Sequence, residues 1–350
     1  MLKSATVETN ILLLQRAPNQ NRLRAFTYTD RTQSLRDALQ AHAAPMPSLT
    51  KDAWFIGGDA EHRLKQKIER IGKPLREWED VEIYYGIKTG LDKAFIIDTA
   101  TRQRILNACK NAAERQRTEA IIKPIPRGRD IKRYTYKWKG QWVILAKFGF
   151  YKEAHLYPAV VAHLSQYEQA LKNRGQCRYG RTGEHSIADY PGQHHWLELD
   201  NNPRDEYLAE FEKEKVVWQR ITREPTFCLV DSGIYILDSM AFFVSDQYLK
   251  YEMAVLNSST ILYYTNKVVH QYGFTGFRLA NQYVEVMPIP LITPQNQPLV
   301  AQIEAFVDEI LARKRGNPNA DTRDLERAID DIVYRLYDLS PDEIRLVEGG

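Results

Sequence analysis

One segment in the first half of the chain combines several cationic side chains with residues that restrict the backbone conformation. Residues 125–134, here called the arginine loop, read IPRGRDIKRY, in which Pro126 has a fixed φ and Gly128 permits a tight turn. The cations of this loop are Arg127, Arg129, Lys132 and Arg133. A guanidinium group on a stiff backbone can make two hydrogen bonds to a guanine edge or grip a phosphate. The competing interpretation is an ion pair between Arg129 and Asp130 that only braces the turn.

Two further turns combine hydrogen-bond donors with aromatic rings. The first lies in residues 81–98, where the pattern predicts a strand, a tight turn and a return strand over Ala94–Ile97. The second is a glycine-rich loop over residues 271–278, whose alternative interpretation is core packing of its phenylalanines. The candidate DNA-contacting side chains are Tyr85, Lys88 and Thr89 in the first turn and Tyr272, Phe274 and Arg278 in the second. Donor-rich loops between aromatic strands suit the reading of base edges better than catalysis.

Motifs that support catalysis or metal binding do not occur in the sequence. There is no glycine-rich phosphate loop, no HExxH and no GxSxG. One histidine group consists of His185, His194 and His195, with Cys177 upstream. Its spacing matches no common zinc site, so we interpret residues 173–205 as a polar loop with these side chains exposed. Residues 210–215, EFEKEK, lack the spacing of a nuclease site and predict a solvated helix face. We predict no catalytic residue and no metal ligand.

The charge of the chain is concentrated in one segment. The net charge is only +3, but residues 102–139 carry twelve Lys and Arg against three acidic residues. Residues 317–350 carry nine acidic residues against four Arg. A near-neutral chain with one basic segment favours a polyanionic partner, and the alternative is a solvated helix face.

Composition places the chain among globular proteins of one large or two smaller domains. Its 350 residues are 43% hydrophobic and 27% charged, which excludes intrinsic disorder. No apolar run approaches the roughly 18 residues of a membrane span. Three cysteines without a CxxC pair argue against a disulfide framework. We expect a cytoplasmic protein that has no membrane segment.

Hydrophobic periodicity predicts the order of helices and strands. Runs of β-branched and aromatic residues over 121–145 and 215–246 predict a twisted, mostly antiparallel sheet. The predicted helices cover 33–43, 59–71 with Asp59 as the N-cap, 101–117, 155–172, Tyr248–Val269, Val300–Lys314 and Asp321–Tyr337. The expected fold class is α+β, with a twisted, mostly antiparallel sheet, flanking helices and a C-terminal helical segment.

An ordered set of short motifs runs from about residue 80 to residue 345. Its members are Tyr85–Gly90 with Ala94–Ile97, Arg127–Tyr134, Tyr157-Pro158, Val216–Gln219, Leu256-Asn257-Ser258, Gly273–Arg278, Pro288-Ile289-Pro290, Ile329–Tyr337 and Leu339–Ile344. In this order they resemble the TaqI-like C-terminal specificity domain. That domain is the target-recognition module of adenine-specific DNA methyltransferases and of type IIG restriction–modification enzymes. The resemblance implies double-stranded DNA as one partner and a methyltransferase domain or subunit as another.

The N-terminal segment resembles the last strands of an amino-methyltransferase domain. Residues 4–14 predict a strand with apolar residues on both faces, which would dock onto a partner's sheet, pair with itself, or join the recognition sheet. The family's S-adenosylmethionine loop and Asn-Pro-Pro-Tyr tetrapeptide do not occur. We therefore expect S-adenosylmethionine on a partner or missing methyltransferase domain and no cofactor on this chain. The expected division is 1–50 as methyltransferase remnant and linker, 51–292 as recognition domain, and 293–350 as spacer or docking segment.

The function expected from these features is sequence-specific recognition of double-stranded DNA in a DNA (adenine-N6) methyltransferase or restriction–modification system. Two alternatives stay open. One is a complete or split methyltransferase with S-adenosylmethionine bound by a partner chain. The other is an assembly protein of a phage-defence complex that makes no DNA contact.

Overall fold

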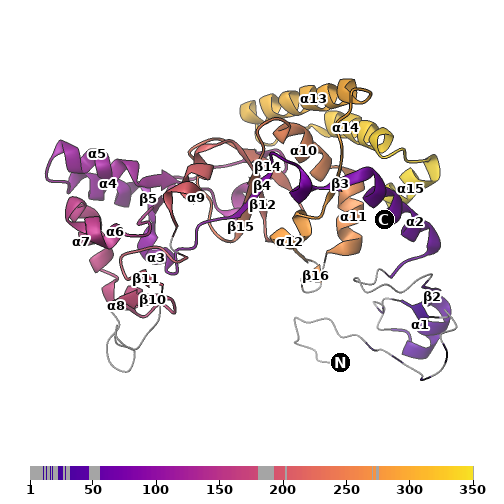
Figure 1. Cartoon of the computed structure of the whole chain (residues 1–350), viewed down its shortest axis with the longest axis horizontal. Helices are drawn as coiled ribbons and strands as arrows, with labels where there is room; N and C mark the ends of the chain where they lie inside the picture. The colour runs from indigo at the N-terminus through magenta and orange to yellow at the C-terminus, as the bar shows by residue number, and fades with distance from the viewer. Residues whose placement is uncertain are drawn as a thin grey trace.

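A central sheet joins two helical lobes along the length of the molecule, as Figure 1 shows. The coordinates are a computed structural model. It describes residues 11, 13, 16, 18, 23–26, 28, 32–46, 56–179, 193–201, 203–269, 271–272 and 276–349. Helix and sheet are mixed and the sheets are small and mostly antiparallel, so the expected α+β class is confirmed.

The central sheet has four strands in the order β14-β12-β15-β4, and every neighbouring pair is antiparallel. Its strands are β4 (Glu82–Tyr85), β12 (Lys215–Gln219), β14 (Phe227–Val230) and β15 (Met240–Val244). Side chains of a strand alternate between its two faces. In β12, Val216 and Trp218 enter one hydrophobic core, whereas Val217 enters a second core. The sheet is therefore a wall between two cores, which explains why its middle strands read as nearly continuous apolar runs.

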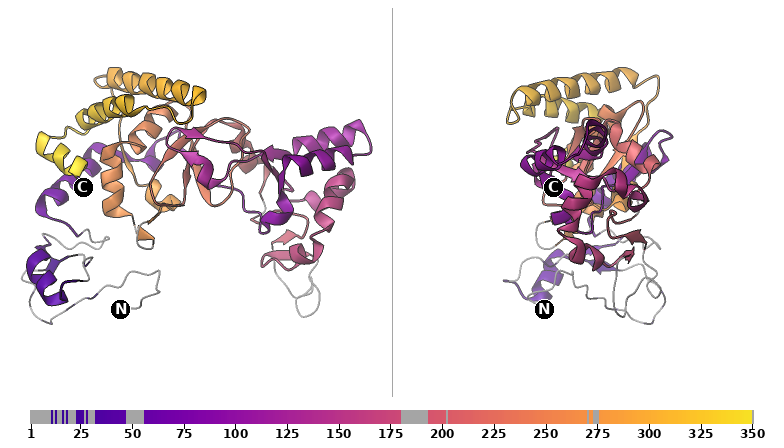
Figure 2. Two further views of the ribbon diagram at one scale, coloured as in Figure 1. Left: turned by 180° about the vertical axis from the view of Figure 1, so that it is seen from behind. Right: turned by 90° about the vertical axis from the view of Figure 1, so that its left-hand side faces the viewer.

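The first core lies between the sheet and the C-terminal helices, which pack together in the views of Figure 1 and Figure 2. Its elements are α2 (Asp59–Ile71), α10 (Leu249–Leu256), α11 (Ser259–Val268), α12 (Asn281–Val284), β18 (Pro288–Pro290), α13 (Gln297–Gly316), α14 (Arg323–Leu336) and α15 (Pro341–Gly349). Strand β3 (Gly72–Pro74) follows α2 and pairs with β18. The helices after residue 293 therefore share a core with α2 and with the central sheet. The proposed limits at residues 50 and 292 stay predictions.

The second core lies on the opposite face of the sheet and forms the other lobe. Its elements are α3 (Asp92–Phe95), β5 (Ile96–Asp98), α4 (Thr99–Asn107), α5 (Ala112–Ala120), β6 (Ile122–Pro124), β9 (Gln141–Ile144), α6 (Phe150–Glu153), α7 (Pro158–Ser165), α8 (Glu168–Lys172) and α9 (Asp205–Ala209). Strands β5, β9 and β6 form a three-stranded antiparallel sheet within this lobe.

Short strand pairs hold the loops that leave the two cores. They are β1 (Arg24–Ala25) with β2 (Ala44–Pro45) beside α1 (Leu35–His42), β7 (Ile131–Lys132) with β8 (Thr135–Tyr136), β10 (Cys177–Tyr179) with β11 (His194–His195), and β13 (Ile221–Thr222) with β17 (Gly276–Arg278) and β16 (Gln271–Tyr272). Among the helices of the described ranges, none is long and apolar enough to cross a bilayer.

Several predicted elements differ from the structure because long-range contacts outweigh local pattern. Ala94 and Phe95 of the predicted return strand lie in the helical turn of residues 92–95, whereas Ile96 and Ile97 do lie in a strand, β5. The prediction is wrong in its pairing, because β5 pairs with β9 and not with β4. The helix over 101–117 is divided into α4 and α5, since Asn111 caps a new helix by accepting from the Glu114 amide.

Two further corrections concern the helices beside the central sheet. The helix over Tyr248–Val269 is interrupted where Ser258 caps α11 by accepting from the Ile261 amide. The helix at 59–71 is confirmed at both ends, but its N-cap is Gly58 rather than Asp59. The strand predicted over residues 4–14 lies mostly outside the described residues.

Candidate nucleic-acid interface

Three residues that run from the last residue of β12 into β13 contact all three of the predicted loops. A Cβ atom on Gly128 of the arginine loop would lie 3.4 Å from the Gln219 side-chain Oε1. The Arg220 guanidinium carbon lies 4.8 Å from the centre of the Tyr85 ring. Ile221 pairs with Arg278 in the antiparallel β13–β17 ladder. Three successive residues, here called the β12 end (Gln219, Arg220 and Ile221), therefore bring together loops that lie far apart in the sequence.

Arg220 has a fixed orientation at this junction. Its Nη1 donates to the Asp238 carbonyl at 2.7 Å, while the guanidinium group stacks on Tyr85. Burial raises the pKa of the Asp238 carboxyl, and the nearby Arg220 charge opposes that rise. An arginine held by a carbonyl and an aromatic face loses little further freedom when it binds a planar or anionic group.

Apolar and cationic side chains around the β12 end face solvent. Tyr85 is 48% exposed and Ile221 is 53% exposed. The predicted cations Arg129, Lys132 and Arg278 are also exposed. Exposed rings and aliphatic groups interleaved with cations can contact both the bases and the phosphates of a nucleic acid.

Some cations of the arginine loop face solvent, and others bond to groups of the protein. Arg127 donates through Nε to the Gln141 side chain, whereas Arg129 is exposed. Asp130 is buried and forms its ion pair with Lys139, so the structure does not show the ion pair of the competing interpretation, in which Arg129 and Asp130 brace the turn. Arg133 faces helix α14, where its Nε lies 2.8 Å from Glu326 Oε2.

The turn after β4 is shaped by a close backbone approach. A Cβ atom on Gly86 would lie 2.1 Å from the Leu237 carbonyl oxygen, so only glycine fits there. Thr89 is buried, and its hydroxyl donates to the Asp92 carboxylate at 2.6 Å. The Lys88 ammonium lies 3.5 Å from Asp200 and is partly exposed. Thr89 therefore holds the turn, while Lys88 remains accessible to a ligand.

A buried arginine fastens this turn to the second lobe. The Nη1 atom of Arg174 donates to the Thr89 carbonyl at 2.9 Å, and its Nη2 donates to the Trp196 and Glu198 carbonyls at 2.8 and 2.7 Å. His194 is buried and its Nε2 lies 2.7 Å from Asp200 Oδ1. Describing His194 as an exposed loop residue was therefore wrong, because it belongs to this network.

The third predicted loop is described only in part. The backbone of Tyr272 belongs to β16, which pairs with β17. Arg278 is the last residue of β17. Phe274 and His185 lie outside the described residues.

Sequence reasoning missed Arg220, Arg174 and the burial of Lys215. The sequence feature that could have indicated Arg220 is the polar pair Gln219-Arg220, which directly follows the buried residues Val216–Trp218. No local pattern distinguishes Arg174 from a surface arginine. Residues 210–215 are not a solvated helix face, because Lys215 is fully buried and opens β12.

The fold is similar to that of one solved restriction–modification enzyme, and a second gives a weaker match. The type IIL restriction–modification enzyme MmeI, solved in complex with DNA, has a TM-score of 0.54 and 12% sequence identity, over 88% of this chain and 37% of its own. The type IIG restriction endonuclease BpuSI has a TM-score of 0.40 and 12% identity, over 80% of this chain and 33% of its own. This chain spans about a third of the length of these enzymes. A search of curated proteins finds no match.

The family match covers the middle of the chain. Residues 123–289 match the model of the TaqI-like C-terminal specificity domain. That range contains the arginine loop, the β12 end and β17, and it begins after the Tyr85 turn. The resemblance inferred from the motifs is thereby confirmed over residues 123–289, which include strands β12, β14 and β15 of the central sheet.

Proposed function

We propose that this chain recognises a specific sequence of double-stranded DNA as the specificity part of a DNA (adenine-N6) methyltransferase or restriction–modification system. The observation that carries the proposal is the meeting of three predicted loops at the β12 end. Exposed cations there would neutralise phosphates and set the register of the duplex, while oriented side chains read base edges.

Arg220 is the strongest candidate for a base contact, because it is the arginine with the most defined orientation at this junction. The arginine loop supplies a second candidate in Arg129, which is exposed on a short turn. Lys88, Lys132 and Arg278 are candidates for phosphate contacts, whereas Arg133 and Thr89 are engaged within the protein.

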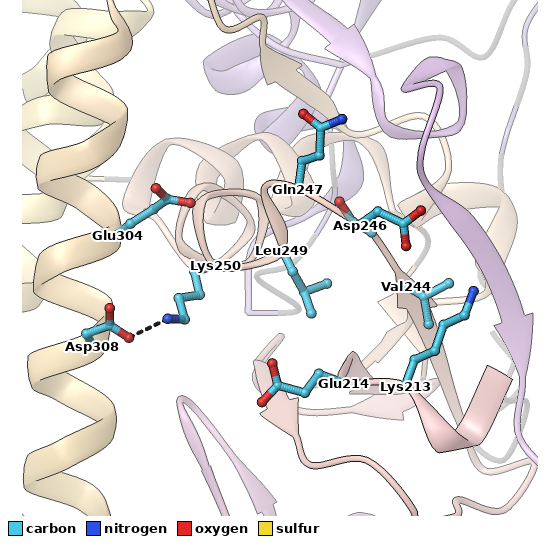
Figure 3. A pocket seen from close by; sticks show the side chains of 10 residues that line it. Lys213, Glu214, Val244, Asp246, Gln247, Leu249, Lys250, Glu304 and Asp308 are labelled. Carbon is cyan, nitrogen blue, oxygen red and sulfur yellow. Dashed lines mark ion pairs between the residues drawn. The ribbon is translucent and has the colours of Figure 1, made fainter.

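S-adenosylmethionine would be held by a methyltransferase domain or subunit rather than by this chain. A depression of about 390 Å³ lies between the start of β12, the α10 N-terminus and α13, and Figure 3 shows its side chains. Its lining is mostly charged, includes no aromatic ring, and contains the Lys250–Asp308 ion pair at 2.6 Å. Without a ring or an apolar cleft for the adenine, this site does not fit the cofactor.

The proposal is tested by selecting bound sequences from randomised duplex DNA with the whole chain. We expect one preferred sequence and a binding constant that falls steeply with salt. Arg220→Ala and Arg129→Ala should each weaken binding to that sequence by about 1–3 kcal/mol and relax the preference at one base pair. Arg315→Ala, which changes an exposed arginine at the end of α13, is the matched control.

Two outcomes would contradict this function. One is the absence of any enriched sequence together with salt-independent binding. The other is an equal effect of Arg220→Ala on all sequences, because a base-reading arginine must change selectivity and not only affinity.

A further inference from the structure

An exposed indole lies between two lysines in the turn that joins β8 to β9. The turn, here called the tryptophan turn, consists of Lys137, Trp138, Lys139 and Gly140. Trp138 is 39% exposed, whereas Trp78 and Trp218 are 8% and 0% exposed. An indole with this much free surface on a short turn offers a large aromatic face to a ligand.

Hydrogen bonds and a ring contact hold the tryptophan turn in place. The Trp138 Nε1 atom donates to the Gln141 carbonyl at 2.8 Å, and the ring packs edge-on against Trp142 with centroids 5.0 Å apart. Gly140 has a φ of +68°, and its carbonyl accepts from Thr99 Oγ1 at 3.1 Å. Because the indole N–H is already bonded, what remains for a ligand is ring surface, which binds by stacking.

The charge around this ring is positive. Lys137 is exposed, and the side chain of Lys139 is 50% exposed although it pairs with the buried Asp130. The Arg102 guanidinium carbon lies 4.3 Å from the Trp142 ring centre, although Arg102 also pairs with Glu119 at 2.6 Å, so most of the free charge at this turn comes from Lys137. A ligand that complements this turn has a flat aromatic ring and a negative charge beside it, and a nucleotide has both.

The tryptophan turn is connected to the arginine loop. Gln141, which accepts from the Trp138 indole through its carbonyl, accepts from the Arg127 Nε through its side chain. The Lys137 amide also donates to the Asp130 carbonyl at 3.1 Å. DNA bound at the arginine loop would therefore pass within reach of the indole.

We propose that the tryptophan turn stacks on an unpaired nucleotide of DNA, with Lys137 and Lys139 beside its phosphates. A base inside an intact duplex has both faces covered by its neighbours, so only an unstacked or single-stranded base offers a free face. This proposal deepens the proposed function and rests on the DNA contact of the arginine loop.

The experiment compares binding of the whole chain to a short oligothymidine and to an oligonucleotide of the same length that has abasic sites. Both ligands carry the phosphates, but only the first carries bases. We expect the unchanged protein to bind the oligothymidine roughly five- to tenfold more tightly, from base–aromatic stacking. Trp138→Ala should abolish that preference, and Trp138→Phe should retain part of it.

Control variants separate stacking from charge. Phe148→Ala removes another exposed ring, which is 47% exposed, and should leave the preference unchanged. The double variant Lys137→Ala/Lys139→Ala should weaken binding to both oligonucleotides about equally and reduce the salt dependence. Thermal melting of each variant shows whether it remains folded.

The proposal is overturned if the unchanged protein shows no preference for bases, or if Trp138→Ala keeps the preference. Duplex selection by Arg220 is measured separately. If the unchanged protein selects duplex sequences but shows no preference for bases, only the stacking role of the tryptophan turn is refuted. If the unchanged protein shows neither property, the proposed function is refuted as well.

Discussion

Asn257 forms two hydrogen bonds to the backbone of a single residue, Phe227, at the edge of the central sheet. Its Oδ1 accepts from the Phe227 amide at 3.0 Å, and its Nδ2 donates to the Phe227 carbonyl at 2.9 Å. Phe227 begins β14, which is an edge strand, so this amide side chain takes the place of a missing neighbouring strand. The break between α10 and α11 is therefore coupled to the end of the sheet.

Asn257→Ala should destabilise the protein by roughly 2–4 kcal/mol, because it leaves the buried Phe227 amide without a partner and leaves the Phe227 carbonyl with only the Tyr134 amide at 3.4 Å. Urea unfolding measures the change. Asn257→Asp should be about as damaging at neutral pH, because a carboxylate cannot donate to the Phe227 carbonyl. If both variants unfold like the unchanged protein, water satisfies these groups and the coupling is absent.

Gly86→Ala should disrupt the turn that carries Lys88. Its new methyl group would lie 2.1 Å from the Leu237 carbonyl oxygen, so the backbone of one segment must move. We expect a loss of roughly 2 kcal/mol or more in the free energy of unfolding. Gly316→Ala at the end of α13, where nothing lies within 4 Å, should be neutral or slightly stabilising and serves as the control.

Glu252 should make stability fall as pH rises from about 4.5 to 8. It is fully buried, and burial raises the pKa of its carboxyl to about 8, with the Asp80 charge adding to the rise. Ser245 Oγ lies 3.2 Å from both the Asp80 and Glu252 carboxyl groups. The folded protein therefore keeps a proton that the unfolded chain releases in this range, and this stabilisation is lost as pH passes the folded pKa.

Glu252→Gln keeps the shape of the group and removes the titration. Its stability relative to the unchanged protein should increase by roughly 2–4 kcal/mol between pH 5 and pH 9. Asp80→Asn should reduce that pH dependence, since it removes the charge that opposes ionisation of Glu252. A stability difference that is independent of pH would show that Glu252 ionises normally.

Lys215 should make the free energy of unfolding depend on pH in the opposite sense to Glu252, and at higher pH. Its Nζ donates to the carbonyls of Phe211, Lys213 and Asp231 at 2.8, 2.7 and 3.1 Å. Burial nevertheless lowers the pKa of Lys215 to about 8. Between pH 8 and the unfolded value near 10.4 the unfolded chain binds more protons, so the contribution of this residue to stability rises with pH.

The measurement is the difference in unfolding free energy between the unchanged protein and Lys215→Met. This difference should grow by roughly 1–3 kcal/mol in favour of the unchanged protein between pH 7 and pH 10. Taking the difference removes the effects of the buried tyrosines, which also titrate in the alkaline range. A flat or declining difference would contradict a depressed pKa.

Local sequence patterns were sufficient for the elements whose periodicity is strong and whose surroundings agree with it. The helix over 59–71 was predicted at both ends, because charged residues cover one face and Leu64 and Ile68 form the other. The antiparallel character of the 215–246 region also followed from its β-branched and aromatic runs. The ordered motifs indicated the specificity domain.

Only the tertiary structure decided which residues meet. Arg220 stacks on Tyr85, and Arg133 pairs with Glu326, although the partners are far apart in the sequence. Ala94 and Phe95 lie in a helical turn although their local sequence pattern predicts a strand. Elements follow from interactions between near neighbours, which a sequence displays. Contacts between distant segments depend on which elements pack against each face of the central sheet. A local sequence pattern does not specify that packing.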